Sequence, residues 1–238
     1  MGSSIRCVRD GAWLQIRFAN VARRNALGPQ EWIELAEAVQ GAASAGVEII
    51  SLTGEGSVFC AGVDKTMLAA AQSEAGGLVS QVRHVGAIVH ALETSPAIVI
   101  AALNGPAIGI GVHLALAADF TLACRDAFLW LPEAAMGIPD VQHHRMLVER
   151  LGKHRALEFA LLGRRLAAQE AHAAGLIGTL VDTPDLIEDE LAGLAARLKA
   201  VPASVRSIIK RAALAQVSSG DPDAQTEAVS QVQKEERS

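Results

Sequence analysis

Hydrophobic positions near the start of the chain follow first a strand-like and then a helix-like period. Strand-like runs at residues 5–7 and 12–18 flank Asp10-Gly11, a turn pair that predicts a β-hairpin. Residues 29–43 then repeat apolar side chains at helical spacing, which predicts an amphipathic helix. The apolar face of this helix contains Trp32, Leu35, Ala36 and Val39.

The rest of the chain alternates between the same two patterns. Short apolar runs predict further strands at residues 49–54, 98–100, 119–124, 127–130 and 177–181. Helical spacing predicts helices over residues 65–92, 113–118, 145–162, 167–174, 186–199, 204–216 and 224–232. Because strands and helices alternate, we expect an α/β core in one domain with a small appended helical part.

Composition narrows the class of protein. Half of the 238 residues are hydrophobic, which is ample material for a core, and the net charge of −5 argues against general nucleic-acid binding. No apolar run is long enough to span a membrane, and no secretory apolar run follows the N-terminal charges. The three cysteines, Cys7, Cys60 and Cys124, are scattered along the chain, so we expect them to be reduced thiols. We therefore expect a cytoplasmic protein without membrane or nucleic-acid partners.

Two glycine-bearing loops follow predicted buried strands. After the strand at 98–100 come a turn at Asn104-Gly105-Pro106, the glycines Gly109 and Gly111, and a small-residue helical run. The first N–H groups of a helix have no internal partner and favour negative charge, so this loop suits either an oxyanion or simple close packing. A similar loop at 56–64 could supply a second N–H, and two donors would stabilise charge on a carbonyl oxygen.

Several residue blocks together resemble the enoyl-CoA hydratase/isomerase (crotonase) family. They occur in the family's order and spacing, and the resemblance runs from about residue 20 to residue 210. The blocks are Phe59-Cys60-Ala61-Gly62-Val63-Asp64, Ala101-Ala102-Leu103-Asn104-Gly105-Pro106-Ala107-Ile108-Gly109-Ile110-Gly111, Asp119, Leu131-Pro132-Glu133 and Gly137-Ile138-Pro139.

The resemblance makes the expected architecture more specific. It implies a spiral of ββα turns that binds acyl-CoA over residues 1–185. A C-terminal helical region over residues 186–238 would then build homotrimers, often paired into hexamers. Lys210 or Arg211 on these helices could reach CoA phosphates, either on the same subunit or on a neighbouring one.

Catalysis in the resembled hydratases depends on two glutamates, which position water and move a proton. Glu133 matches the second glutamate, in a Pro-Glu pair after a short strand. The position of the first is occupied by His113, which can act as a base near neutral pH but lacks the acceptor geometry of a carboxylate. His113 therefore has two open interpretations, a role in the pocket or packing beneath the loop.

Asp140 is the third candidate catalytic residue. Allowing a one-residue deletion, it falls where some isomerases of the family carry an aspartate, so Glu133 and Asp140 could together move a double bond. Alternatively, Asp140 caps a helix that begins near Val141, and we favour the cap because it needs no gap. The following Gln142-His143-His144 we interpret as surface helix residues, since no third metal ligand has an evident spacing.

The resemblance also assigns oxyanion and substrate-binding positions. The two oxyanion donors would be the backbone N–H groups of Val63 and Ile110, where the family usually has glycine at the second position. Arginine suits phosphate geometry, so Arg23 and Arg24 could meet CoA phosphates, although a solvated surface pair remains an alternative. The full set of candidate substrate-binding residues is Arg23, Arg24, Ala26, Ala61, Asp64, Lys65 and Gly109.

The resemblance implies an acyl-CoA enzyme that uses no metal and no cofactor, with CoA as part of the substrate. The nominal reaction is reversible hydration of a 2-enoyl-CoA through a thioester enolate. Two alternatives stay open: an enoyl-CoA double-bond isomerase using Glu133 with or without Asp140, and a catalytically idle acyl-CoA-binding subunit. The sequence leaves acyl chain length and pathway undetermined.

Overall fold

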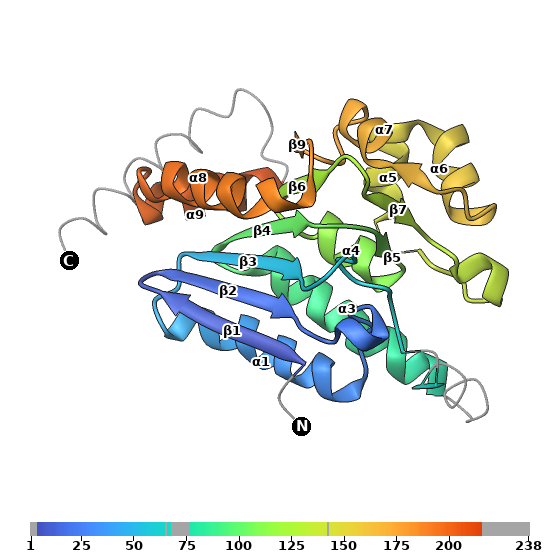
Figure 1. The fold of residues 1–238 in the computed structure, drawn as a ribbon, viewed down its shortest axis with the longest axis horizontal. Coiled ribbons are helices and arrows are strands. Elements are labelled where there is room, and N and C mark those ends of the chain that lie inside the picture. Colours follow the sequence, from blue (N-terminus) through green and yellow to red (C-terminus); the bar gives the residue numbers. More distant parts are fainter. Residues whose placement is uncertain (1–3, 65, 68–76, 142, 216–238) are drawn as a thin grey trace.

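The computed structural model describes residues 4–64, 66–67, 77–141 and 143–215, and it is an α/β protein with C-terminal helices (Figure 1). The predicted helix over residues 224–232 lies outside this described part. The predicted helix over 65–92 is described at 66–67 and from Gly77 onward.

Six strands form the main sheet, in the spatial order β1-β2-β3-β4-β6-β9. Strands β1 and β2 are antiparallel, which confirms the predicted hairpin, and every other neighbouring pair is parallel. A second sheet has the order β5-β7-β8. The strands are β1 (Ile5–Asp10), β2 (Trp13–Phe18), β3 (Ile49–Gly54), β4 (Ile98–Leu103), β5 (Ala107–Ile108), β6 (Phe120–Cys124), β7 (Phe128–Trp130), β8 (Leu166–Ala167) and β9 (Thr179–Val181).

Helices pack against both the main sheet and the smaller sheet. In Figure 1, α1 and α3 lie along one side of the main sheet, and α8 and α9 lie near β4 on the other. The α-helices are α1 (Pro29–Ser44), α3 (Gly77–Thr94), α4 (Ile110–Leu116), α5 (His144–Leu151), α6 (Lys153–Leu161), α7 (Ala168–Ala173), α8 (Ile187–Lys199) and α9 (Ala203–Ala215). Three 3-10 turns are η1 (Val21–Arg23), η2 (Glu133–Met136) and η3 (Pro184–Leu186).

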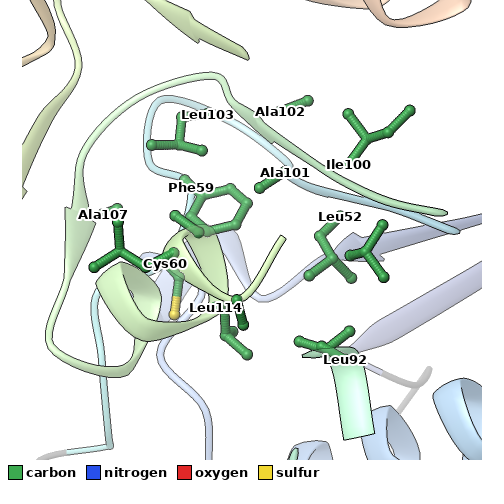
Figure 2. Close-up of a cluster of buried hydrophobic side chains, with 14 of the residues drawn as sticks. Leu52, Phe59, Cys60, Leu92, Ile100, Ala101, Ala102, Leu103, Ala107 and Leu114 are labelled. Atoms are coloured by element: carbon green, nitrogen blue, oxygen red, sulfur yellow. The ribbon is translucent and has the colours of Figure 1, made fainter. Parts of the chain in front are cut away.

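The core forms where β3 and β4 run side by side. Every residue of both strands is buried, as expected for parallel strands covered on both faces. Figure 2 shows Phe59 and Cys60, from the loop after β3, in the same buried cluster as Ala101 of β4 and Leu114 of α4. The loop that follows β3 is therefore held by the core itself.

One predicted helix is divided in the structure. The pattern over 145–162 predicts a continuous helix, but Gly152 has φ +76° and separates α5 from α6. A backbone at that φ cannot continue a right-handed helix, and glycine adopts it without steric cost.

The C-terminal helix α9 is fixed to the core by buried cations. Lys210 Nζ lies 2.8 Å from Asp119 Oδ2 and donates to the Ala97 carbonyl at 2.9 Å. The Arg206 guanidinium pairs with Glu48. The Lys210 ammonium group is thus already paired inside the protein. The expected contact of Lys210 or Arg211 with CoA phosphates, on this or a neighbouring subunit, stays a prediction. The division into residues 1–185 and 186–238 stays a prediction.

Candidate active site

Two side-chain amides shape the loop that follows β3. Asn104 accepts from the Gly54 N–H at 3.0 Å and donates to the Gly56 carbonyl at 2.8 Å. Asn25 donates to the carbonyls of Glu55 and Val58. Because these contacts satisfy backbone groups that a sheet would otherwise pair, the loop holds a fixed shape beside the end of β4.

Glycines allow the two loops to touch. A Cβ on Gly105 would lie 2.1 Å from the Ser57 carbonyl oxygen, a distance that no real Cβ tolerates. A Cβ on Gly62 would lie 3.1 Å from the Ile108 carbonyl oxygen. The close approach of backbones therefore explains these glycines and supports the packing interpretation of the loops. The oxyanion interpretation stays a prediction.

The N–H groups of Val63 and Ile110 both remain available in the described structure. Leu27 donates to the Gly62 carbonyl and accepts from the Asp64 N–H, at 2.9 and 3.0 Å. Successive residues of an extended chain direct their backbone polar groups to opposite sides, so the Val63 N–H faces away from Leu27. Ile110 is the first residue of α4, where an N–H has no intrahelical acceptor.

A cavity of about 1290 Å³ lies where these loops meet. Its wall includes the predicted catalytic residues and most of the predicted substrate-binding residues, drawn from segments far apart in the sequence. The predicted site residues that line it are Arg23, Arg24, Ala26, Ala61, Val63, Asp64, Gly109, Ile110, His113, Glu133 and Asp140. Lys65 is outside the described residues, so its predicted contact with substrate stays a prediction.

Glu133 begins η2 and lies directly beside Gly109. A Cβ on Gly109 would stand 2.6 Å from Glu133 Oε1, so the absent side chain is what makes room for the carboxyl group. Glu133 Oε2 is buried and has no hydrogen-bond partner among the described residues. Burial raises the pKa of Glu133 to about 7; the nearby Asp140 charge adds to the rise, and the backbone N–H of Glu133 opposes it. Glu133 is therefore able to exchange a proton near neutral pH.

His113 and Asp140 face each other within the same wall. His113 Nε2 lies 2.9 Å from Asp140 Oδ2, and the two side chains are 5% and 12% exposed. The expectation that Asp140 caps a helix near Val141 is wrong, because α5 begins at His144 and its N-cap residue is His143. His113, which lies 27 residues earlier in the chain, instead holds Asp140 in the pocket wall.

His143 also differs from its predicted position. It has a left-handed backbone, φ +55°, and its side chain is only 5% exposed, so the interpretation as a surface helix residue is wrong. His143 Nδ1 lies 3.1 Å from His113 Nδ1, and His143 Nε2 lies 3.2 Å from Glu93 Oε1. The sequence analysis missed Glu93, and its only signal was its place near the end of a predicted helix.

The Arg23 side chain is engaged within the protein. Its Nη1 lies 2.5 Å from Asp64 Oδ2, although the arginine is 61% exposed. Hydrogen bonds from Thr66, followed by the Arg23 contact, lower the pKa of Asp64. Asp64 therefore stays ionised and joins the arginine-bearing η1 to the loop that carries Val63.

A family model described as enoyl-CoA hydratase/isomerase matches residues 9–238. The chain belongs to the enoyl-CoA hydratase/isomerase family. The expected crotonase-like fold is confirmed by solved structures. An enoyl-CoA hydratase from Bacillus anthracis superposes with a TM-score of 0.87 at 28% identity, covering 97% of this chain and 91% of that one.

Other relatives extend the family assignment. The Mycobacterium bovis protein named "Probable enoyl-CoA hydratase echA6" is 35% identical over 175 residues, 72% of this chain and 69% of its own length. A 4-chlorobenzoyl coenzyme A dehalogenase-2 of Arthrobacter is 30% identical over 200 residues, 82% of this chain and 72% of its own. A Thermobifida fusca protein solved in complex with CoA superposes with a TM-score of 0.81 at 29% identity, covering 98% and 92% of the two chains.

Within the described ranges, no helix combines the length and apolar character needed to cross a membrane. Among the same residues, no group of three histidine, cysteine, aspartate or glutamate side chains is arranged to hold a metal ion.

Proposed function

We propose that this member of the enoyl-CoA hydratase/isomerase family moves a proton on the acyl chain of an enoyl-CoA thioester through Glu133. The observation that carries the proposal is Glu133 Oε2, a buried carboxylate oxygen in the pocket wall without a partner among the described residues. Burial also brings the pKa of Glu133 to about 7, where a carboxyl group can both accept and return a proton.

The oxyanion would be held by backbone N–H groups. The free N–H groups of Val63 and Ile110 lie on the two touching loops and line the same cavity as Glu133. We propose that both donate to the thioester oxygen and so stabilise the enolate that forms when a neighbouring carbon loses a proton. A backbone donor survives the exchange of glycine for isoleucine at position 110.

The surroundings of His113 favour double-bond migration over hydration. Hydration in this family needs a second group to position water, and both ring nitrogens of His113 are already taken by Asp140 and His143. Asp140 lies close enough to raise the pKa of Glu133, which provides a second carboxyl group along the acyl chain. We therefore propose that Glu133 removes a proton and that Glu133 or Asp140 returns it at another carbon.

Hydration of a 2-enoyl-CoA is the second candidate reaction. It is supported by the match of Glu133 to one of the family's two glutamates and by the names of the relatives. The finding that weighs against it is the engagement of His113, which leaves one free carboxylate where hydratases of the resembled type use two.

CoA recognition is assigned to the rim of the pocket. Arg24 lines the cavity, and Arg23 is exposed while its other side contacts Asp64. A guanidinium group that is anchored at one edge can still present further N–H donors to a phosphate. The expected homotrimer or hexamer and the expected cytoplasmic location also remain proposals.

The reaction can be identified in deuterated water. The purified protein is incubated separately with crotonyl-CoA and with a 3-enoyl-CoA, and products are identified by mass spectrometry and NMR. Isomerisation predicts a shifted double bond with deuterium on the acyl chain and no added water. A 3-hydroxyacyl-CoA product would instead establish hydration.

A third outcome contradicts both reactions. If both thioesters bind, as measured by calorimetry, but neither exchanges deuterium nor gives a product, the protein is the idle acyl-CoA-binding subunit that the sequence left open. Binding measured in the same samples separates that result from a failure to recognise CoA.

Replacing Gly109 by alanine tests the contact that makes room for the carboxyl group of Glu133. The added Cβ would lie 2.6 Å from Glu133 Oε1, so the carboxyl group must move. A misplacement of about 1 Å is expected to lower kcat by about 10²-fold. Gly152→Ala is a matched control, because Gly152 also has a positive φ but nothing lies within 4 Å of its added Cβ. Equal activity losses in the two variants would contradict the prediction.

A further inference from the structure

Four buried or half-buried side chains form a continuous line from the pocket to α3. Asp140 lies 2.9 Å from His113, the two imidazoles lie 3.1 Å apart through their Nδ1 atoms, and His143 lies 3.2 Å from Glu93. The imidazole rings are nearly parallel, at 17°, with centroids 5.4 Å apart. The carboxyl group of Glu93, at the far end, is 35% exposed.

The three contacts along this line need one more proton than two neutral imidazoles and two ionised carboxylates carry. The two hydrogen bonds of the line, between the Nδ1 atoms and from His143 to Glu93, each need one proton. The third contact is an ion pair, in which His113 Nε2 must carry a proton to attract Asp140 Oδ2 at 2.9 Å. Three protons are therefore needed. Two neutral imidazoles between two ionised carboxylates supply only two protons, because a neutral imidazole carries one N–H. If both Nε2 atoms donate to the carboxylates, both Nδ1 atoms present lone pairs that repel at 3.1 Å.

We propose that Asp140, His113, His143 and Glu93 hold one shared extra proton and relay it between the pocket and the Glu93 carboxylate. With that proton, the two imidazoles carry one positive charge between two carboxylates, and all three contacts are satisfied. In the relay, each ring accepts a proton on one nitrogen and releases one from the other. The proton that enters at Asp140 therefore leaves at Glu93 and passes to water.

The charges around the line support a stored proton. The low solvent exposure of His113 and His143, 5% each, strengthens electrostatic interactions between these groups. At the outer end, the hydrogen bond from His143, together with the charges of His90 and Lys210, lowers the pKa of Glu93. At the inner end, the charge of Asp140 contributes to the raised pKa of Glu133. The outer carboxyl group thus stays ionised and stabilises the positive charge on the imidazole pair.

The catalytic consequence rests on the proposed function. After Glu133 takes a proton from one carbon of the acyl chain, the stored proton can pass through Asp140 to the other carbon, and water replaces it at Glu93. Glu133 then releases the proton that it took when the product leaves. The structure thereby assigns His143 and Glu93 as positioning residues that neither line the cavity nor contact the substrate. The stored proton itself is a property of the free protein and needs no turnover.

The test is NMR of the free, full-length protein with ¹⁵N-labelled histidine at neutral pH. Chemical shifts and coupling across the hydrogen bond report which ring nitrogens carry protons. The expected result is a proton shared between the Nδ1 atoms of His113 and His143. Two protonated Nε2 atoms with both Nδ1 atoms bare would overturn the proposal, whether or not the protein turns over an enoyl-CoA.

Two variants separate the relay from ordinary structural support. His143→Asn removes the second ring at a left-handed position that asparagine tolerates, and Glu93→Gln keeps the shape but removes the terminal charge. Both are expected to abolish the shared-proton signal and to lower solvent deuterium incorporation per turnover roughly tenfold, less than the roughly 10²–10⁴-fold loss for a group that transfers the substrate proton directly. His154→Asn is the control, because His154 is 93% exposed. Unchanged signal and exchange in Glu93→Gln would overturn the relay.

Discussion

Replacing Glu133 by glutamine is expected to lower turnover of an enoyl-CoA by about 10²–10⁴-fold while leaving CoA binding nearly unchanged. Glutamine fills the same space but cannot accept or return a proton, and the Oε2 atom of Glu133 in the pocket wall has no hydrogen-bond partner among the described residues. Steady-state kinetics with the preferred thioester would measure the loss, and calorimetry would measure binding.

The pH dependence of the wild-type enzyme follows from the same group. Burial raises the pKa of Glu133 from 4.5 to about 7, so proton abstraction from substrate requires pH values above that. We expect kcat/KM for a 3-enoyl-CoA to fall about tenfold per pH unit below pH 7 and to level off above it. The fall in kcat/KM below pH 7 should be absent from the residual activity of Glu133→Gln.

The stability of the folded protein should fall over the pH range in which its activity rises. Because the folded-state pKa of Glu133 is raised above its ordinary value of 4.5, the folded protein binds the proton more tightly than the unfolded chain. The wild-type protein therefore loses stability as pH rises from about 4.5 to about 7. Glutamine carries no charge, so Glu133→Gln should be more stable than wild type at pH 8 and similar at pH 4.

A surface variant provides the control for both measurements. Glu149 on α5 is 57% exposed and pairs with Arg145 one helical turn away. Glu149→Gln should leave activity and its pH profile unchanged and alter stability by less than about 0.5 kcal/mol. If Glu133→Gln retained more than half of the wild-type turnover, Glu133 would not be the proton-transfer residue.

Replacing Lys210 by methionine is expected to destabilise the protein by about 3–5 kcal/mol. The ammonium group is 5% exposed, lies 2.8 Å from Asp119 Oδ2 and also donates to the Ala97 carbonyl. Burial raises the pKa of Asp119 and Lys210 opposes that rise, so losing the lysine leaves a buried carboxylate uncompensated. Urea unfolding followed by circular dichroism would measure the change in free energy of unfolding.

Two comparisons show whether the buried charge is the cause. Arg125→Met removes an exposed pair with Asp182, 51% and 73% exposed, and should cost no more than about 1 kcal/mol. Adding Asp119→Asn to Lys210→Met should recover part of the loss, because the unpaired charge is removed as well. A double variant less stable than Lys210→Met would show that Asp119 contributes chiefly through its contact with the Val99 N–H.

Local sequence patterns were sufficient for much of the fold and for part of the site. The strands β3 and β4 were predicted as buried apolar runs, and the loops after them were predicted from their glycines. Glu133, Val63 and Ile110 were named as site residues only through the resemblance to the enoyl-CoA hydratase/isomerase family, because the motifs that carry it are short and continuous in sequence. Their expected roles come from the same resemblance.

Other assignments depended on contacts between distant segments. Asp140 looked like a helix cap because only the residues next to it could be judged, yet α5 begins later and His113 holds the carboxyl group. His143 looked exposed because a helical position was assumed, but its left-handed backbone turns the ring inward.

The sequence by itself therefore determined the α/β alternation and the glycine loops, since each is a periodic or short-range feature, and the motifs of the family resemblance pointed to Glu133. Only the tertiary structure decided the partners of the charged side chains. His143 meets His113 across 30 residues and Glu93 across 50, and Lys210 reaches Ala97 across 113. Such pairings follow from how the helices pack on the sheet, and no periodicity along the chain encodes them.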